Sequence, residues 1–344
     1  MKRLLSIVAI SALVLGGLFF IAVKTVPGQN FLLNRAATAI AAQQDVTGEG
    51  LRVFVCGSAA PIPTPGRAQA CVAVLTPEHF FVIDAGAGSA NNLGLAGLPV
   101  DRLDGVLLTH FHSDHIADLP TLNVQAWATG HEGPLKVYGP PGVQQVVDGY
   151  NMALAQDRVY RSEHHGVSFM PPEYGVMEPV EHAKEARLEF GELTITAFEA
   201  DHSPIDPAVS YRFDYQGRSV VITGDTIVTD RLRTMVDDAD LLLTDALSLP
   251  IVETIKKGAE GGGRDRLAHI LGDIQDYHAH TEHVIELTKN TGVKMTALYH
   301  LVPGPRNKVM ENVFKRGFTD NMVLTHDGMW FELPADSDTI DVVD

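Results

Sequence analysis

The segment from His110 to His115 constrains this chain more than any other feature, because it places three histidines and one aspartate almost side by side. The apolar run Leu103–Leu108 just before it predicts a buried β-strand. In an extended segment, residues i and i+2 point to the same side, so His110 and His112 can bind one metal ion together. Asp114 and His115 follow where the chain turns, and they can face a second ion. Imidazole and carboxylate ligands suit zinc, and also manganese or iron.

This cluster resembles the signature motif of the metallo-β-lactamase superfamily, and the resemblance covers about residues 51–332. Four further motifs of that family have counterparts in the same order along the chain. Their key residues are Asp84 in Val82–Gly86, His202 after Asp201, Asp225 in Thr223–Thr226 and His300 in Leu298–Leu301. The resemblance implies an α/β fold of the αββα type, a four-layer sandwich of two mixed sheets with helices outside. Predicted strands and helices interleave along the chain, which excludes the all-α and all-β classes.

The resemblance also implies a binding site for two divalent metal ions, zinc in the first place and manganese or iron as alternatives. The first ion would be bound by His110, His112, His202 and Asp225. The second ion would be bound by Asp114, His115, Asp225 and His300. Asp84 would support the metal-binding loop without binding an ion itself. Some alternatives stay open, since His182 is a rival to His202 as a ligand, and Asp84 could be an ordinary turn residue.

The implied chemistry is hydrolysis by a hydroxide that both metal ions share, since each ion lowers the pKa of bound water. Asp114 is a candidate catalytic residue as well as a ligand. The leaving group needs a proton donor, and the resemblance to ribonuclease Z-like and arylsulfatase-like enzymes implies His278. His280 is the alternative donor, and Glu282 is predicted to support the site from behind the ligands. Both histidines could instead only support the second metal ion.

The predicted substrate is a small or medium phosphodiester or sulfate ester. Asp225 favours these over a β-lactam, because true β-lactamases of this fold usually have cysteine or histidine there. Ribonuclease Z-type cleavage at the 3′ end of tRNA is the alternative. The stretch from His202 to Asp225 is too short for the tRNA-binding arm that such enzymes typically carry. The net charge of −17 also repels phosphates, so nucleic acid is a disfavoured partner.

Two other classes of function stay open. A metal-dependent oxidoreductase of this fold would be coloured or would consume oxygen, and a non-catalytic binding module would keep its metals for structure. An oligomer is also compatible with the sequence.

The N-terminus predicts a membrane anchor. An uncharged apolar run from Leu4 to Val23 follows Lys2 and Arg3, and about 20 helical residues cross a bilayer. We therefore expect a signal anchor or transmembrane helix over residues 1–24, a linker over 25–48, a catalytic domain over 49–334 and an acidic tail over 335–344. The basic N-terminus predicts a single-pass protein of the cytoplasmic membrane with an extracytoplasmic catalytic domain. A secreted or periplasmic protein, after signal cleavage, is the alternative.

The two cysteines, Cys56 and Cys71, end one predicted strand (Leu51–Val55) and open another (Val72–Thr76). A disulfide between them is permitted outside the cytoplasm, and two buried free thiols are the alternative. Neither cysteine has a second cysteine at metal-site spacing.

The region after the fourth motif is predicted to contain a strand at Leu241–Leu243 and a helix near Pro250–Lys257. The glycine-rich segment Gly258–Gly263 that follows predicts a mobile loop. A phosphate-binding loop is disfavoured there, because the Lys-Ser/Thr ending of a P-loop is missing. Thr281–Asn290 is predicted to be a helix, and Lys294–Tyr299 a strand that leads into His300.

Overall fold

The computed structural model describes residues 2–41 and 48–344, which fall into two compact units, Met1–Gln44 and Asp45–Asp344. The first unit holds two helices, α1 (Lys2–Lys24) and α2 (Val26–Ala41). The segment predicted as a linker, residues 25–48, thus contains a helix, and its residues 42–47 lie outside the described part. The domain bounds proposed from the sequence stay a prediction.

The predicted transmembrane helix is wrong. Crossing the hydrocarbon core of a bilayer takes about 20 consecutive apolar residues in a helix. Within residues 2–41 and 48–344, no helix is both long enough and apolar enough to do this. The membrane partner and the single-pass location in the cytoplasmic membrane, which we derived from that helix, are therefore not supported.

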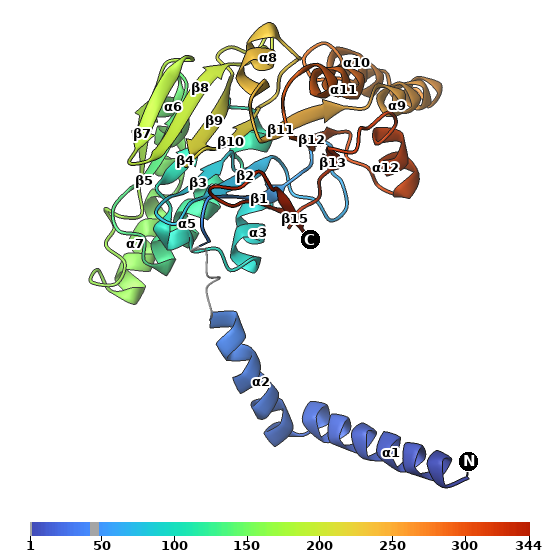
Figure 1. The fold of residues 1–344 in the computed structure, drawn as a ribbon. Coiled ribbons are helices and arrows are strands. Elements are labelled where there is room, and N and C mark those ends of the chain that lie inside the picture. The colour runs from blue at the N-terminus through green and yellow to red at the C-terminus, as the bar shows by residue number, and fades with distance from the viewer. Residues whose placement is uncertain (1, 42–47) are drawn as a thin grey trace. The chain divides into compact units, whose positions relative to one another are not determined.

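The second unit is built on two packed β-sheets (Figure 1). The eight-stranded sheet has the order β15-β14-β1-β2-β3-β4-β5-β6, and the seven-stranded sheet has the order β13-β12-β11-β10-β9-β8-β7. The strands of the first sheet are β1 (Leu51–Gly57), β2 (Cys71–Leu75), β3 (Phe80–Ile83), β4 (Gly105–Leu107), β5 (Leu135–Gly139), β6 (Met177–Glu181), β14 (Trp330–Leu333) and β15 (Asp341–Val343). Those of the second are β7 (Ala186–Phe190), β8 (Leu193–Glu199), β9 (Val209–Tyr215), β10 (Arg218–Ile222), β11 (Leu241–Leu247), β12 (Met295–Val302) and β13 (Met322–Leu324).

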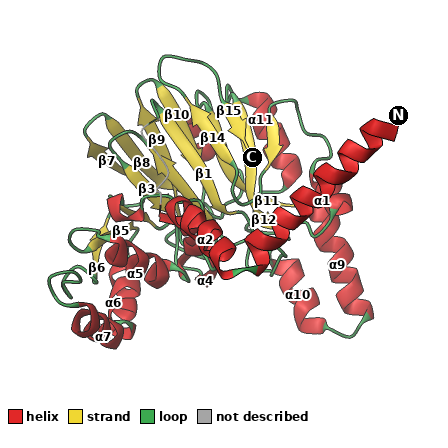
Figure 2. Cartoon of the chain, turned by 90° about the horizontal axis from the view of Figure 1, so that it is seen from below, coloured by secondary structure: helices red, strands yellow, loops and turns green. Residues whose placement is uncertain are grey.

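Helices cover the outer faces of both sheets, which gives the expected four-layer αββα sandwich (Figure 2). The elements between β3 and β6 are α3 (Ser89–Leu95), a 3₁₀ turn (Val100–Arg102), α4 (Ser113–Ile116), α5 (Leu119–Thr129), α6 (Val143–Ala153) and α7 (Ala155–His165). Those between β10 and β13 are α8 (Asp230–Val236), α9 (Leu249–Gly261), α10 (Asp265–Asp273), α11 (Thr281–Asn290) and α12 (Lys308–Phe314).

The main core lies between the two sheets. Val53 of β1 and Phe81 of β3 pack there with Tyr211 and Phe213 of β9, and all four are fully buried. The central strands read as nearly continuous apolar runs because sheets covered on both faces bury both sides of each strand. Burying one such side chain contributes about 1.5–3 kcal/mol, so the sandwich provides a rigid frame for side chains at its edge.

The second unit contains the disulfide that the sequence analysis offered as one alternative, and its acidic C-terminal tail forms a strand. A disulfide joins Cys56 to Cys71, whose Cα atoms lie 5.0 Å apart, on neighbouring strands β1 and β2. The acidic C-terminal tail contributes strand β15, which pairs with β14 from Trp330↔Val343 to Glu332↔Asp341. Backbone pairing at the sheet edge, rather than side-chain polarity, decides the structure of that tail.

The glycine-rich segment after the fourth motif is not the loop that we predicted. Helix α9 continues to Gly261, and α10 begins at Asp265, so the two helices form a hairpin. Glycine is a poor helix former, but α9 packs against α10 and buries Ala259. This packing offsets the low propensity, and it places a helical hairpin beside the strand ends.

A buried ion pair between Arg218 and Asp240 stabilises the seven-stranded sheet. The Asp240 carboxylate accepts hydrogen bonds from Arg218 Nε at 3.1 Å and from the Ser219 backbone N–H at 2.7 Å, and Lys294 Nζ lies 2.9 Å from it. The side chains of Arg218 and Asp240 are only 2% and 4% exposed. Burial alone would raise the pKa of Asp240, but the hydrogen bonds from Arg218 and Lys294 outweigh burial and lower it.

Asp240→Ala is expected to lower the free energy of unfolding by about 3–5 kcal/mol, because it leaves the buried Arg218 guanidinium without its carboxylate. Urea denaturation measures the effect. Asp238→Ala is the control, because its side chain is 81% exposed in its pair with Arg212, and its loss should cost less than about 1 kcal/mol.

The pKa of Asp240 is lowered on folding, so the stability that Asp240 contributes is present at neutral pH and disappears as the pH falls through the folded-state pKa. Equal effects of the two variants would contradict this account.

Candidate metal centre

The polar residues singled out from the sequence lie where strands of both sheets end. β3 runs parallel to β4, and β10 runs parallel to β11 and then β12. The carboxyl ends of parallel strands meet at the same edge of a sheet, which is where ligands bind in many α/β folds. Asp84 follows β3, Asp225 follows β10 and His300 lies on β12, so chain segments far apart in sequence converge at one edge (Figure 1).

One group of metal-ligating side chains consists of His110, His112, His202 and Asp225. His110 Nε2 lies 3.1 Å from His112 Nδ1, and His202 Nε2 lies 3.4 Å from the same atom. Asp225 Oδ2 lies 3.8 Å from His110 Nε2 and 3.7 Å from His202 Nε2. The ligand atoms of the group lie within 4.8 Å of one another, which is the separation that ligands around one ion would have.

A second group forms on the other side of Asp225. Its members Asp114, His115 and His300 can also hold an ion. Asp114 Oδ2 is 3.1 Å from His300 Nε2 and 3.6 Å from His115 Nε2. The other carboxylate oxygen of Asp225, Oδ1, lies 3.4 Å from His115 Nε2 and 3.3 Å from His300 Nδ1. Asp225 therefore faces both groups, with one oxygen directed at each.

Unpaired buried atoms show that this arrangement fits a divalent metal. Among the described residues, His115 Nε2, Asp225 Oδ1 and His300 Nδ1 are buried without a hydrogen-bond partner. An unsatisfied buried polar atom costs about 1–3 kcal/mol, and a bound cation would remove that cost for all three. Nitrogen and carboxylate donors are also the ligands that divalent transition metals take in proteins.

The protonation states of the histidines in the first group suit metal binding. Burial lowers the pKa of His202 to about 4, and burial together with His115 lowers the pKa of His110 well below its usual value. Both rings are therefore neutral near pH 7, which is the form that binds a metal. Burial alone would raise the pKa of Asp225, but His300 and His115 outweigh burial and hold it well below its usual value. Burial alone would lower the pKa of His115, but the carboxylates of Asp225 and Asp84 outweigh it and raise that pKa.

Asp84 belongs to neither ligand group, but it orients His115 through hydrogen bonds. Its Oδ2 accepts hydrogen bonds from His115 Nδ1 at 2.7 Å and from Thr109 Oγ1 at 2.8 Å, and its Oδ1 accepts from the Thr109 backbone N–H at 2.8 Å. This leaves His115 Nε2 directed at Asp225. A carboxylate in such a position fixes the tautomer and orientation of a metal-binding histidine.

Two residues of the site have an uncommon backbone conformation. Asp84 (φ 56°) and His300 (φ 42°) both adopt the left-handed region, which costs about 1–3 kcal/mol for residues with a side chain. A close approach also requires glycine at position 86, where an added Cβ would lie 2.1 Å from the Asp114 carbonyl oxygen. Strained positions of this kind cluster at functional sites.

His278 and Asp245, together with Asp225 and His300, form a third group of side chains that could hold an ion. The His278 side chain is 5% exposed, and its Nδ1 is 2.9 Å from Asp245 Oδ2 and 3.9 Å from Asp225 Oδ2. Burial raises the pKa of Asp245, although its hydrogen bond with His278 opposes the shift. Sequence reasoning missed Asp245. The available signal was an acidic residue near the end of an apolar strand, β11, which neighbours the strands leading to Asp225 and His300.

Three predicted or rival residues lie outside the two groups. His280 Nε2 is 2.9 Å from the Gln275 carbonyl oxygen, and its ring stacks on His283. Glu282 is exposed in the first turn of α11. His182, the alternative to His202, forms a hydrogen bond of 3.0 Å between its Nε2 and the Tyr211 hydroxyl. His202 instead donates from Nδ1 to the Tyr277 carbonyl oxygen at 3.0 Å. Its Nε2 is then directed at the first group.

Such a centre at the edge of an αββα sandwich defines a metal-dependent hydrolase of the metallo-β-lactamase type. A family model described as a beta-lactamase superfamily domain matches residues 79–301. A curated ribonuclease Z of Mycobacterium bovis (strain BCG / Pasteur 1173P2) is 31% identical over 256 residues, which are 74% of this chain and 86% of that protein. The ribonuclease Z of Mycobacterium avium (strain 104) is 32% identical over the same shares. This chain therefore belongs to the metallo-β-lactamase superfamily and is ribonuclease Z-like.

Solved structures show the same fold. The short form of human tRNase Z (ELAC1) covers 82% of this chain and 99% of its own, with a TM-score of 0.59 and 18% identity. The metallo-β-lactamase fold protein YhfI of Bacillus subtilis covers 83% of this chain and 100% of its own, with a TM-score of 0.60 and 19% identity. At these identities the likeness concerns the fold alone.

The comparisons correct one prediction. The curated relatives bear the name ribonuclease Z, which assigns RNA to those proteins as substrate. The prediction that nucleic acid is a disfavoured partner is therefore wrong. The net charge of −17 is a sum over the whole chain, and such a sum does not exclude a local site that offsets the charge of a phosphate.

Proposed function

We propose that this chain is a phosphodiesterase of the ribonuclease Z type, which cleaves a phosphodiester bond of RNA with the help of two divalent metal ions, zinc in the first place. The observation that carries the proposal is the position of Asp225, with one oxygen facing each of two adjoining ligand groups. The ribonuclease Z relatives support RNA over a sulfate ester as substrate.

The ligand assignment follows the two groups. His110, His112, His202 and Asp225 would hold the first ion. Asp114, His115 and His300 would hold the second together with Asp225. When bound, two such metal ions lower the pKa of a bound water molecule and offset negative charge on the phosphate. Asp114 and Asp225 would balance the positive charge of the ions, and Asp84 holds His115 in a fixed orientation by its hydrogen bond to Nδ1.

The chain's own residues then handle the proton of the leaving group. Asp245 holds His278 at Nδ1, which leaves Nε2 as the ring atom that can carry a proton towards the substrate. A leaving sugar oxygen needs that proton, because an alkoxide is a poor leaving group. Asp245 acts through His278 and is therefore a positioning residue, whereas His280 is turned to the Gln275 carbonyl.

A rate comparison tests the proposal. The full chain, loaded with zinc or manganese, should hydrolyse bis-p-nitrophenyl phosphate at least about tenfold faster in kcat/KM than p-nitrophenyl sulfate. It should also cleave a precursor tRNA with a 3′ extension, and a chelator should abolish both activities. A preference for the sulfate would overturn the phosphodiesterase assignment, and hydrolysis of the phosphodiester without cleavage of RNA would overturn the ribonuclease assignment.

A further inference from the structure

A pocket of about 710 Å³ lies between helices α9, α10 and α12, outside the two ligand groups. Its walls are aliphatic and include Ile251 and Ile255 of α9, Leu267 and Leu271 of α10, and Val313 of α12. The hairpin α9–α10 and the neighbouring helix α12 are seen at the right of Figure 1. The volume falls in the range of roughly 300–1,000 Å³ that small-molecule sites occupy. We call this hollow the α9–α12 pocket.

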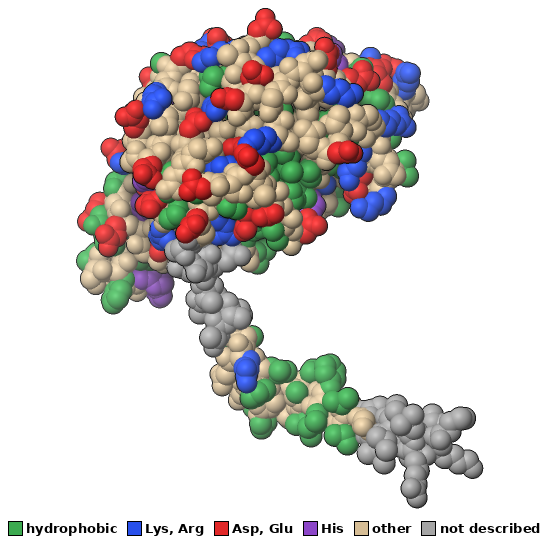
Figure 3. Space-filling model, in the orientation of Figure 1, with side chains coloured by type: hydrophobic (Ala, Val, Ile, Leu, Met, Phe, Trp, Pro, Cys, Tyr) green, Lys and Arg blue, Asp and Glu red, His purple; other side chains and the backbone are tan. Residues whose placement is uncertain are grey.

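Three arginines line this aliphatic pocket: Arg264, Arg306 and Arg316. Arg306 donates to the Pro63 carbonyl oxygen at 2.9 Å. Arg264 and Arg316 are exposed, and neither forms an ion pair within residues 2–41 and 48–344. No acidic side chain is among the lining residues. Elsewhere on the face shown in Figure 3, basic and acidic side chains are interspersed, whereas this apolar pocket is lined by three guanidiniums and no carboxylate.

We propose that the α9–α12 pocket binds an anionic aliphatic molecule, with its hydrocarbon chain between the helices and a phosphate at the arginines. Guanidinium groups match phosphate oxygens in geometry and charge. The lining contains no aromatic side chain, so it offers no platform on which a nucleic-acid base would stack. The aliphatic walls instead gain free energy by burying a hydrocarbon chain, at about 0.8 kcal/mol for each buried CH₂.

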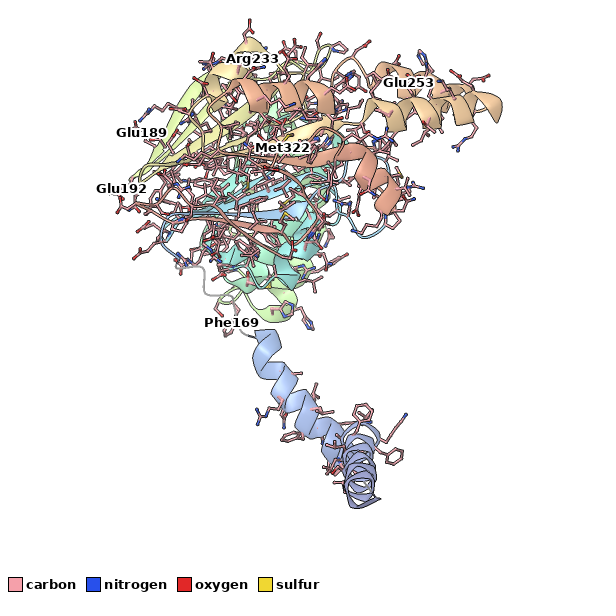
Figure 4. All side chains as sticks on the ribbon, turned by 45° about the vertical axis from the view of Figure 1, so that its right-hand side comes forward. Phe169, Glu189, Glu192, Arg233, Glu253 and Met322 are labelled. Atoms are coloured by element: carbon pink, nitrogen blue, oxygen red, sulfur yellow. A yellow bond between two sulfur atoms is a disulfide. The ribbon has the colours of Figure 1, made fainter. Side chains whose placement is uncertain are left out.

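The pocket shares segments with the metal centre. Gln275 Nε2 donates to Glu253 Oε1 on α9 at 2.8 Å, and the loop that carries Gln275 leads directly into Tyr277 and His278. Glu253 is labelled on α9 in Figure 4. Pro303 and Gly304 line the pocket just after His300 on β12. The pocket therefore adjoins the proposed active site, but the inference rests on the pocket alone and does not depend on the proposed function.

Binding of dodecyl phosphate, below its micelle concentration, to the metal-loaded full chain tests the inference by titration calorimetry. We expect saturable binding of one molecule, at least about tenfold tighter than that of methyl phosphate. Methyl phosphate has the same head without the chain, so it reports any affinity of the metal centre for a phosphate. Dodecyltrimethylammonium, which has the chain with the opposite charge, should not bind saturably.

Two matched pairs of variants locate the site. Arg316→Glu and Ile255→Glu should each weaken dodecyl phosphate binding at least about tenfold. Lys315→Glu changes the same charge one residue away, and Ile270→Glu changes an isoleucine that is 49% exposed on α10 outside the pocket. Both controls should stay within about twofold. Ile255 is itself 37% exposed, so its change should not unfold the chain, and urea denaturation of each variant checks this.

Several results would overturn the inference. One is the absence of saturable dodecyl phosphate binding, and another is equal weakening by the pocket variants and their controls. Displacement of dodecyl phosphate by a short RNA, with the same dependence on Arg316 and Ile255, would assign the pocket to nucleic acid instead.

Discussion

Asp225→Ala is expected to reduce kcat/KM for bis-p-nitrophenyl phosphate by at least on the order of 10³-fold, and to lower the bound metal content. The physical reason is that a single carboxylate faces both ligand groups. Its Oδ2 lies 3.7 Å from His202 Nε2, and its Oδ1 lies 3.4 Å from His115 Nε2. Alanine removes both oxygens and leaves a cluster of buried imidazoles with one carboxylate fewer. Steady-state kinetics and elemental analysis of the purified variant measure the two effects.

Asp201→Ala is the matched control for that experiment. Asp201 immediately precedes the ligand candidate His202, but its own side chain is exposed and lies outside both ligand groups. We expect the control to keep its metal and to change activity by no more than about twofold. Near-normal activity of Asp225→Ala with a reduced metal content would contradict a mechanism that requires both ligand groups.

His278→Ala is expected to slow cleavage of a dinucleotide by about 10²–10⁴-fold, and to affect bis-p-nitrophenyl phosphate much less. The leaving group of a dinucleotide is a sugar alkoxide that must be protonated, whereas p-nitrophenolate leaves without a proton. The metal content should be unchanged, because neither proposed ligand set includes His278. Asp245→Asn should give a smaller loss of the same kind and should shift the pH profile, since Asp245 acts by holding Nδ1 of His278.

His280→Ala distinguishes the two candidate acids. Its ring is held by the Gln275 carbonyl and stacks on His283, so its removal should slow both substrates to the same small extent. If His280→Ala instead showed the selective loss with the dinucleotide, His280 would be the acid and the assignment of His278 would be wrong. A loss of metal in His278→Ala would show that this residue is a ligand.

His278 and His280 are an example of two residues whose roles could not be distinguished from the sequence. The two residues are separated by one alanine, and spacing alone cannot say which ring faces the metal centre. The structure separates them, because Ala279 is buried and His280 begins the turn into α11. A change in backbone direction over two residues directs one ring at Asp245 and the other away from it. Asp245 was missed for a related reason, since its partner lies 33 positions away in sequence.

For the N-terminal segment, the sequence led to a definite prediction that was wrong. An apolar run between basic residues predicted a membrane-spanning helix, but apolar content along a chain is only a necessary condition for spanning. Among the described residues no helix meets both the length and the apolarity that a bilayer requires. The glycine-rich segment after β11 was misread in a similar way, because low helix propensity was outweighed by packing of α9 on α10.

The αββα sandwich and the candidate ligands outside the His110–His115 cluster came from the resemblance to a known family. By itself the sequence excluded the all-α and all-β classes and indicated the ligands of that cluster, because strand periodicity and metal-ligand chemistry act over a few neighbouring residues. His110, His112, Asp114 and His115 are recognisable for that reason. Only the tertiary structure decided that Asp245 holds His278 and that three arginines line one pocket. Each of these depends on where strands and helices distant in sequence meet, and that placement is set by burial of the apolar core between the two sheets.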